Sequence, residues 1–257
     1  MAAKRGKFIL FEGLDRSGKS TQTRLLLNAI RQRGKQAEQL SFPDRKTLIG
    51  KLIGDYLRGS SKPASSEGKD KIQIENSETL VDEKSKDIKQ TENESVLDDK
   101  AIHLLFSANR WEKQTLMRKL LDSGVDLVVD RYIYSGIAFS CAKGMDFDWC
   151  KAPDVGLIAP DLVVFLNVNI EESTAREGFG SERYETRQFQ SLVLKQFQKL
   201  EKMAVPQSSN HSLDVVSQQP LWITINASQS IDSISKSVIS YYNSLQDKSP
   251  GDYFIFK

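Results

Sequence analysis

The stretch from Phe8 to Thr21, FILFEGLDRSGKST, limits most strongly what this chain can fold into. Four apolar residues open it, four residues separate Gly13 from Gly18, and Lys19 and Ser20 follow. This spacing is that of a P-loop, in which a buried strand turns through glycines into a helix. The backbone N–H groups of such a loop wrap an anion, and the positive end of the helix points at the same place. The stretch therefore predicts a binding site for the phosphates of a nucleoside triphosphate.

Side chains in two segments are typical of a Mg²⁺-dependent site. Lys19 would add a cation over the β- and γ-phosphates, and Ser20 would offer its hydroxyl to Mg²⁺. A buried strand is expected over 125–129, and it ends in Asp130-Arg131-Tyr132. An acid at the carboxyl end of a strand beside a P-loop can hold Mg²⁺ through water. We expect Ser20 and Asp130 to be the metal ligands, although Asp130 could also merely end the strand.

The remaining pattern alternates strands with helices and predicts a three-layer α/β protein. We expect a parallel sheet of about five strands with helices on both faces, formed by strands at 8–11, 37–42, 125–129, 162–168 and 221–225. Helices are expected at 21–33, 46–57, 101–112, 189–203 and 231–245, and residues 135–139 are interpreted as a loop that enters a helix. The chain has 257 residues, 39% of them hydrophobic, which is enough to bury the core of a single domain.

Two segments depart from this alternation. Residues 59–99 are rich in Ser, Lys, Glu and Asp and contain no aromatic residue, so they bury too little apolar surface to offset the entropy of ordering. We interpret them as a mostly disordered acidic insertion whose composition names no partner. Residues 176–187 carry Arg176, Arg183 and Arg187 among glycines and are interpreted as a flexible lid.

Composition also bounds where the protein works. No apolar run approaches the length of a membrane span, and the basic start of the chain leads into a strand rather than a signal peptide. The two cysteines, Cys141 and Cys150, have no histidine near them in the sequence and are expected to be free buried thiols. We expect a cytoplasmic protein, with the nucleus as a further location. His103 and His211 are expected to be structural or exposed.

Six segments, in chain order, resemble one family. They are FEGLDRSGKSTQ at 11–22, FPDR at 42–45, HLLFSANRWE at 103–112, VVDRYIYSGIAFS at 128–140, PDLVVFLNV at 160–168 and GFGSERYE at 178–185. This set is similar to the thymidylate kinases of the eukaryotic type. The resemblance implies a P-loop kinase fold, transfer of the γ-phosphoryl group of ATP to dTMP with Mg²⁺, and a homodimer. It implies no nucleic-acid or membrane partner, and the apolar helix face of Ile102 and Leu105 is a candidate dimer contact.

The residue types suit that reaction independently of the resemblance. A phosphate monoester has a second pKa near 6, so its oxygen is already an anionic nucleophile at neutral pH and needs no general base. Such an enzyme must instead align two anions and neutralise the charge on the transferred group, which calls for arginines, a lysine and Mg²⁺. The P-loop, the segment after Asp130 and the lid supply these cations.

The resemblance also implies roles at the phosphates. Asp15 would accept a hydrogen bond from the sugar 3′-hydroxyl, and Arg16 would reach the transferred phosphoryl group, as in the eukaryotic arrangement. Arg45 and Arg131 would clamp the phosphate of dTMP. The implied catalytic residues are Asp15, Arg16, Lys19 and Arg131. The implied ATP site consists of the loop, two lid arginines and two residues near adenine: Gly13, Leu14, Asp15, Arg16, Ser17, Gly18, Lys19, Ser20, Thr21, Arg176, Arg183, Asn226 and Ala227.

The implied dTMP site draws on several elements. Phe106 would stack on thymine, Arg110 would donate to a base carbonyl, and Phe139 would crowd the 2′ side of the sugar. From position alone, Phe106 could equally be ordinary core and Arg110 an exposed helix arginine. The full implied set is Asp15, Phe42, Pro43, Arg45, Phe106, Arg110, Arg131, Gly136, Phe139, Tyr184 and Gln190.

Other functions remain open at the level of the sequence. A deoxynucleoside kinase would need a carboxylate base, and Asp15 keeps that alternative in play. A regulatory nucleotide-binding module of the GTP-switch type would carry an Asn-Lys-x-Asp element and an Asp-x-x-Gly after its third strand, and the chain has neither. Within the lid, Arg187 exceeds the family's usual pair of arginines and could share the catalytic role of Arg16.

Overall fold

Five parallel strands form one sheet in this computed structural model, which describes residues 4–59, 97–176, 178–204 and 220–257. The strand order is β2-β3-β1-β4-β5. The bounds are β1 (Phe8–Gly13), β2 (Ala37–Ser41), β3 (Asp126–Asp130), β4 (Leu162–Asn167) and β5 (Leu221–Asn226). The central strands are continuous apolar runs because helices cover both faces of the sheet. The predicted fold class is confirmed.

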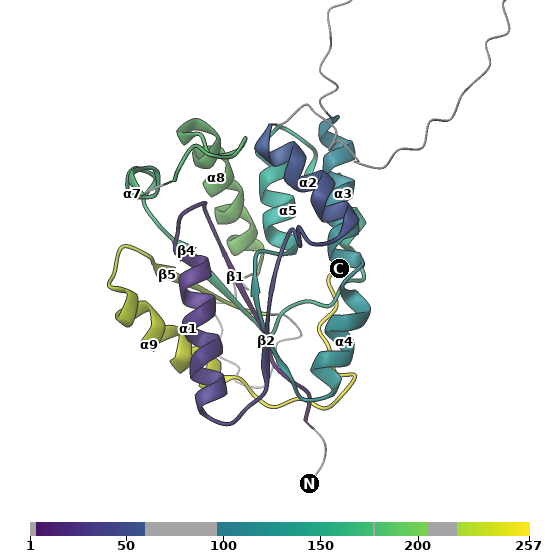
Figure 1. Cartoon of the computed structure of the whole chain (residues 1–257), viewed down its shortest axis with the longest axis vertical. Helices are drawn as coiled ribbons and strands as arrows, with labels where there is room; N and C mark the ends of the chain where they lie inside the picture. Colours follow the sequence, from purple (N-terminus) through teal and green to yellow (C-terminus); the bar gives the residue numbers. More distant parts are fainter. Residues whose placement is uncertain (1–3, 60–96, 177, 205–219) are drawn as a thin grey trace, which may run out of the picture.

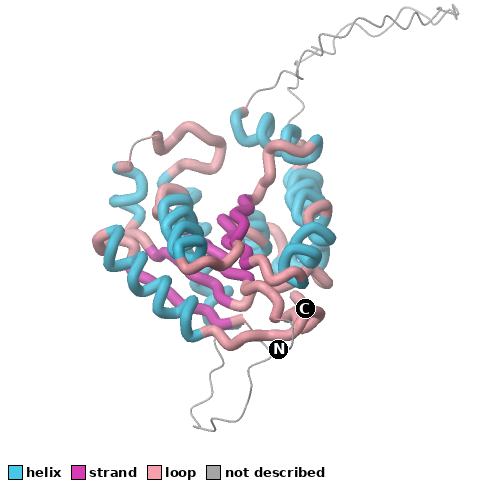
Figure 2. Tube along the Cα trace, turned by 60° about the horizontal axis from the view of Figure 1, so that its bottom comes forward, coloured by secondary structure: helices cyan, strands magenta, loops and turns pink. Residues whose placement is uncertain are grey.

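Helices pack on the two faces of this sheet (Figures 1 and 2). On one face α1 contacts α9, and on the other α5 contacts both α3 and α8. The helix bounds are α1 (Lys19–Gln32), α2 (Leu48–Arg58), α3 (Asp99–Trp111), α4 (Gln114–Asp122), α5 (Ile133–Cys141), α6 (Phe147–Lys151), α7 (Ile170–Ala175), α8 (Arg187–Ala204) and α9 (Ile231–Ser244). None of the helices within the described ranges is both long and apolar enough to cross a membrane.

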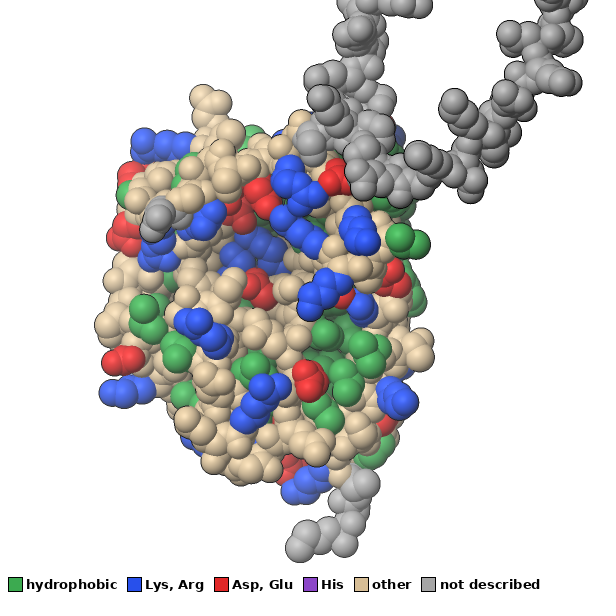
Figure 3. Space-filling view, viewed as in Figure 1, with side chains coloured by type: hydrophobic (Ala, Val, Ile, Leu, Met, Phe, Trp, Pro, Cys, Tyr) green, Lys and Arg blue, Asp and Glu red, His purple; other side chains and the backbone are tan. Residues whose placement is uncertain are grey.

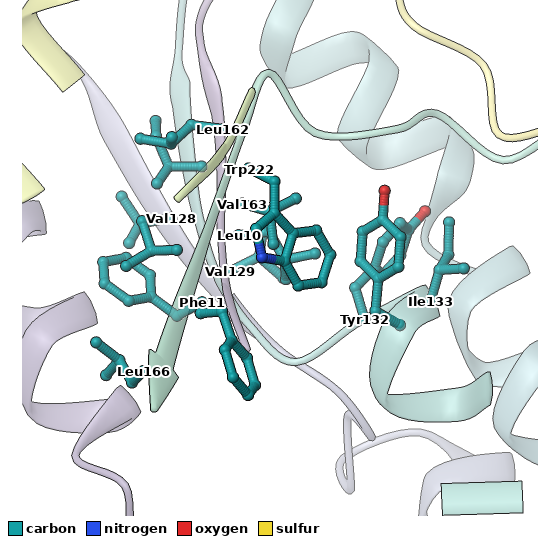
Figure 4. Close-up of a cluster of buried hydrophobic side chains, with 14 of the residues drawn as sticks. Leu10, Phe11, Val128, Val129, Tyr132, Ile133, Leu162, Val163, Leu166 and Trp222 are labelled. Atoms are coloured by element: carbon teal, nitrogen blue, oxygen red, sulfur yellow. The ribbon is translucent and has the colours of Figure 1, made fainter. Parts of the chain in front are cut away.

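The core lies between the central strands and these helices. Leu10 of β1 pairs in register with Val129 of β3 on one side and with Val163 of β4 on the other, and all three side chains are fully buried (Figure 4). The same register sets Phe11 opposite Asp130. The P-loop and the Asp130-Arg131 pair therefore leave the sheet at one edge, where parallel α/β sheets bind ligands.

Several expectations about local structure were wrong. Residues 135–139 are helical, because α5 already begins at Ile133. Its 3.6-residue periodicity is hard to see because the helix is buried on nearly all sides. The short helices α4, α6 and α7 were not predicted. Most of the 59–99 insertion lies outside the described residues, and its predicted end overlaps α3, where Asp98 caps the helix by accepting from the N–H of Lys100.

Cys141 and Cys150 are free and buried, as expected. His103 is also buried, with Nδ1 2.7 Å from the hydroxyl of Ser140 and Nε2 2.9 Å from the carbonyl oxygen of Cys150. Burial, followed by the charge of Arg110, lowers the pKa of His103. The predicted structural role of His103 agrees with this placement.

The lowered pKa of His103 makes stability depend on pH. At a pH between the two pKa values of His103, the unfolded chain binds more protons than the folded chain. The contribution of His103 to the free energy of unfolding is therefore complete above about pH 6.5 and falls as the pH decreases. We expect the free energy of unfolding in urea to fall more from pH 7.5 to pH 5.5 in the wild type than in His103→Gln. The glutamine can keep hydrogen bonds but cannot titrate. An equal loss in both proteins would contradict this reading.

Candidate active site

The phosphate loop has the backbone that its glycines predict. Gly18 has a φ of 94° at the N-terminus of α1, a conformation that suits glycine. The ammonium group of Lys19 is buried and donates to the carbonyl oxygens of Leu14 at 2.6 Å and Gly13 at 3.3 Å. The loop therefore curves tightly around the end of the Lys19 side chain, in the place where phosphates would bind.

Ser20 and Asp130 meet at the edge of this loop. The Ser20 hydroxyl donates to Oδ2 of Asp130 at 2.7 Å, across a sequence separation of 110 residues. A hydroxyl and a carboxylate are oxygen donors of the kind that Mg²⁺ prefers. Within the described part of the chain no group of three or more His, Cys, Asp or Glu could hold a metal. The pair therefore fits a Mg²⁺ that takes its other ligands from phosphates and water.

Asp15 and Arg131 form an ion pair beside the loop, and Gln190 completes it. Gln190 donates from Nε2 to Oδ2 of Asp15 at 2.7 Å and accepts from the Asp15 N–H at 3.1 Å. Burial opposes the charge of Asp15, but Arg131 and then Lys19 outweigh it and hold the pKa of Asp15 below its ordinary value. Asp15 is thus an ionised acceptor at neutral pH.

A cavity of about 310 Å³ adjoins this pair. Figure 3 shows Lys and Arg side chains gathered in and around a hollow near the carboxyl ends of the strands. The cavity wall combines charged side chains with the aromatic rings of Phe106, Phe139 and Tyr184. The predicted dTMP residues on its walls are Asp15, Phe42, Pro43, Arg45, Phe106, Arg110, Arg131, Gly136, Phe139 and Tyr184. This lining suits a small molecule that combines an anionic group with a flat apolar part.

Arg110 is held by a partner that the sequence did not reveal. Its guanidinium is fully buried and binds Asp154 through Nε at 3.0 Å and Nη2 at 2.6 Å, so the interpretation as an exposed helix arginine is wrong. A Cβ at residue 136 would lie 2.7 Å from Nη2 of Arg110, which explains why glycine stands there. The pair fixes Arg110 on the cavity wall, while its contact with a base stays a prediction.

Two of the lid and loop arginines lie together over the phosphate loop. Arg176 donates from Nη1 to the Arg16 carbonyl at 2.5 Å and from Nη2 to that of Ala227 at 3.4 Å. Arg16 donates from Nη2 to the Gly178 carbonyl at 2.5 Å. Asn226 ends β5 directly before Ala227. The structure thus brings Arg16, Arg176 and the predicted adenine end to one side of the loop.

Arg183 and Arg187 make their contacts away from the phosphate loop in this structure, and the role of Arg183 at ATP stays a prediction. Arg183 donates from its backbone N–H to the Leu57 carbonyl at 2.9 Å and from Nε to that of Tyr56 at 3.2 Å. The last carbonyls of a helix lack N–H partners farther along the helix, and Arg183 supplies donors to two of them at the end of α2. Arg187 pairs with Glu171 at an exposed position, so it does not contact the phosphate loop.

Three charged residues of the site, Glu182, Glu185 and Lys143, were not predicted from the sequence. The Glu185 carboxylate accepts from the N–H groups of Gly180 at 2.8 Å and Ser181 at 2.9 Å and so organises the lid turn. Glu182 pairs with Arg45 at 2.6 Å. Lys143 lies 4.7 Å over the ring of Tyr184. The first two stand in the GFGSERYE segment, where an acid soon after glycines could have signalled a turn; Lys143 gave no such signal.

The strand, phosphate loop and helix adjoin the Ser20 to Asp130 pair and the cavity described above, which cations line. Together these features define a P-loop phosphotransferase. Comparison with known proteins makes this more specific. The family model for thymidylate kinase matches residues 11–69 and 65–238. The chain therefore belongs to the thymidylate kinase family.

Individual relatives agree with this assignment. The human thymidylate kinase is 40% identical over 239 residues, covering 93% of this chain and 90% of the relative. That of Schizosaccharomyces pombe is 40% identical over 235 residues, covering 91% and 90%. A solved structure of thymidylate kinase from Candida albicans superposes with a TM-score of 0.72 at 31% identity and covers all of both chains. The likeness thus extends over nearly the whole length.

Proposed function

We propose that this chain transfers the γ-phosphoryl group of ATP to dTMP and releases dTDP and ADP, a step of dTTP biosynthesis. Membership of the thymidylate kinase family supports both substrates. The proposal rests on the position of Arg131, whose guanidinium pairs with Asp15 of the phosphate loop and lies in the wall of the cavity. A kinase that acts on a monophosphate needs a cation between its two anions. The chain is an ATP-dependent dTMP kinase.

The donor half rests on the phosphate loop. Lys19 compensates the charge of the β- and γ-phosphates, and the loop N–H groups bind their oxygens. Ser20 and Asp130 would hold Mg²⁺, which when bound neutralises charge on the transferred phosphoryl group. Arg176 spans from the loop backbone to Ala227, so its cation would lie between the phosphates and adenine.

The acceptor half uses the cavity. Arg131 and Arg45 in its wall bind the dTMP phosphate, and Asp15 accepts from the 3′-hydroxyl. Phe106 stacks on the flat base, Phe139 crowds the 2′ side of the sugar, and Tyr184 helps to close the site. Gln190 keeps Asp15 in place and also donates to the Tyr184 carbonyl at 2.9 Å. This arrangement aligns the phosphate oxygen with the γ-phosphoryl group.

A kinase that phosphorylates a hydroxyl is less favoured. Such an enzyme needs a carboxylate base. Asp15 is occupied by Arg131 and Gln190, and its low pKa makes it a weak proton acceptor. A monophosphate acceptor needs no base, because its oxygen is already anionic. Family membership and the state of Asp15 therefore favour the same acceptor.

A coupled assay of ADP release with ATP and Mg²⁺ tests this function directly. We expect the highest rate with dTMP, a lower rate with dUMP, and background rates with thymidine, dCMP, dGMP and AMP, because the site must bind both a phosphate and a thymine. Activity with thymidine would instead make the protein a hydroxyl kinase. Background rates with every acceptor would leave only a nucleotide-binding role.

Arg16 is the loop residue best suited to the transition state. Its guanidinium lies between the Gly178 carbonyl and Oε1 of Glu185, which is 3.5 Å from Nε, so lid and loop hold it together. We expect Arg16→Ala to remove about 3 kcal/mol of transition-state stabilisation and so to lower kcat, with little change in ATP affinity. Arg187→Ala, which removes an exposed cation of the same lid, is the matched control and should leave kcat unchanged. Weakened ATP binding at normal kcat would assign the catalytic cation elsewhere.

We also propose that the enzyme is a homodimer, with a contact face different from the predicted one. Ile102 is buried inside its own chain, so it cannot form that face. The exposed apolar residues of α2 and α3 are Leu48, Leu52, Leu104 and Trp111. Exposed large apolar side chains favour association when they lie together. Light scattering should give the mass of two chains for the wild type and of one chain for Leu48→Glu; a monomeric wild type would refute the proposal.

The proposed location is the cytoplasm, with the nucleus as a further site. Two free buried thiols suit a reducing compartment. Fractionation of cells with an antibody to the protein would test this, and recovery from a secreted or membrane fraction would contradict it.

A further inference from the structure

Glu12 is fully buried at the end of β1, directly before the phosphate loop. Its Oε1 accepts from the backbone N–H groups of Tyr132 and Ser135, each at 3.0 Å. Its Oε2 accepts from the Ser135 hydroxyl at 2.5 Å. An ionised carboxylate is an acceptor only, and here three donors face it. Such complete pairing is what allows a charge to stay buried.

These contacts fix the turn that carries Arg131. Because α5 begins at Ile133, Tyr132 and Ser135 belong to its first turn, where the helix dipole favours a negative charge. Arg131 itself has a φ of 63°, a left-handed conformation that residues other than glycine keep only when their surroundings hold it. Glu12 binds the N–H of the very next residue, so it anchors this backbone conformation.

The guanidinium of Arg131 is tied to the same place. Its Nη1 donates to the Gly13 carbonyl and to the Ser135 hydroxyl, each at 3.0 Å. The Ser135 hydroxyl therefore donates to Glu12 and accepts from Arg131, and links the two side chains. Burial raises the pKa of Glu12, while the Ser135 hydroxyl and the charge of Arg131 act against that rise. The carboxylate and the guanidinium thus support one another through Ser135.

We propose that Glu12 is a positioning residue of the kinase reaction, which holds Arg131 toward the acceptor phosphate without touching either substrate. The inference rests on the proposed function, since that function gives Arg131 its role at the phosphate of dTMP. Loss of Glu12 should therefore weaken the binding of dTMP more than the binding of ATP. Lys19 and the loop N–H groups, which serve ATP, would keep their contacts.

Glu12→Gln is the test variant, because its amide oxygen can still accept the two N–H groups while the negative charge is lost. We expect KM for dTMP to rise about tenfold and KM for ATP to change less than twofold. Asp161→Asn is the matched control. Asp161 is a buried acid that accepts from the N–H of Phe8 at 2.8 Å, at the other end of β1, so its loss should reduce stability and leave KM for dTMP unchanged.

Ser135→Ala is a milder second variant that removes only the linking hydroxyl and should raise KM for dTMP in the same direction. If Glu12→Gln does not fold, the KM for dTMP of Ser135→Ala tests whether Glu12 positions Arg131. In an Arg131→Gln background, Glu12→Gln should change KM for dTMP less than twofold, because Glu12 acts through Arg131. Unchanged KM for dTMP in both single variants, or independent effects that multiply in the double variant, would overturn the assignment.

The wild type separates this inference from the proposed function. If the wild type fails to phosphorylate dTMP, the proposed function fails. If the wild type is active and the Glu12→Gln and Ser135→Ala variants bind dTMP normally, the inference about Glu12 fails alone.

Discussion

β1 lies between β3 and β4 and pairs with both in parallel. Because the three strands run the same way and Phe11 stands opposite Asp130, the phosphate loop and the Asp130-Arg131 segment emerge side by side. The Ser20 to Asp130 contact and the Asp15 to Arg131 pair both span more than a hundred residues of sequence, and both follow from this register. A shift of one residue would reverse the direction of every side chain on the strand and separate these groups.

Charge pairing is the second constraint, because the site concentrates buried ionic groups. Asp15 pairs with Arg131, three donors face Glu12, and the Lys19 ammonium donates to the carbonyl oxygens of Gly13 and Leu14. A buried charge that lost its partner would be costly, so these residues depend on one another. In the proposed function, the Asp15 to Arg131 pair is a common wall of the donor and acceptor sites, and the two phosphates would meet beside it.

Much of this arrangement followed from the sequence because its causes are local. The glycine spacing of the P-loop, the apolar strands and the acid after β3 each carry their own signal, and the Ser20 to Asp130 contact follows from them. The partner of Arg110 could not be predicted, since Asp154 lies 44 residues away and only the packed structure joins them. The contacts of Arg183 could not be predicted either, because the sequence does not show that the carbonyls at the end of α2 lie within its reach. The helix α5 was missed because burial on nearly all sides hides its period.

On this proposal, the cavity beside the Asp15 to Arg131 pair binds a nucleoside monophosphate through its phosphate. Isothermal titration of the wild type with dTMP and with thymidine measures the contribution of that group, because the two ligands differ in nothing else. Two charge-assisted contacts, from Arg45 and Arg131, each worth roughly 1.5–3 kcal/mol, predict that dTMP binds about a hundredfold or more tightly than thymidine. Equal affinities would contradict the proposed acceptor site, because Arg45 and Arg131 would then contribute nothing to binding the acceptor.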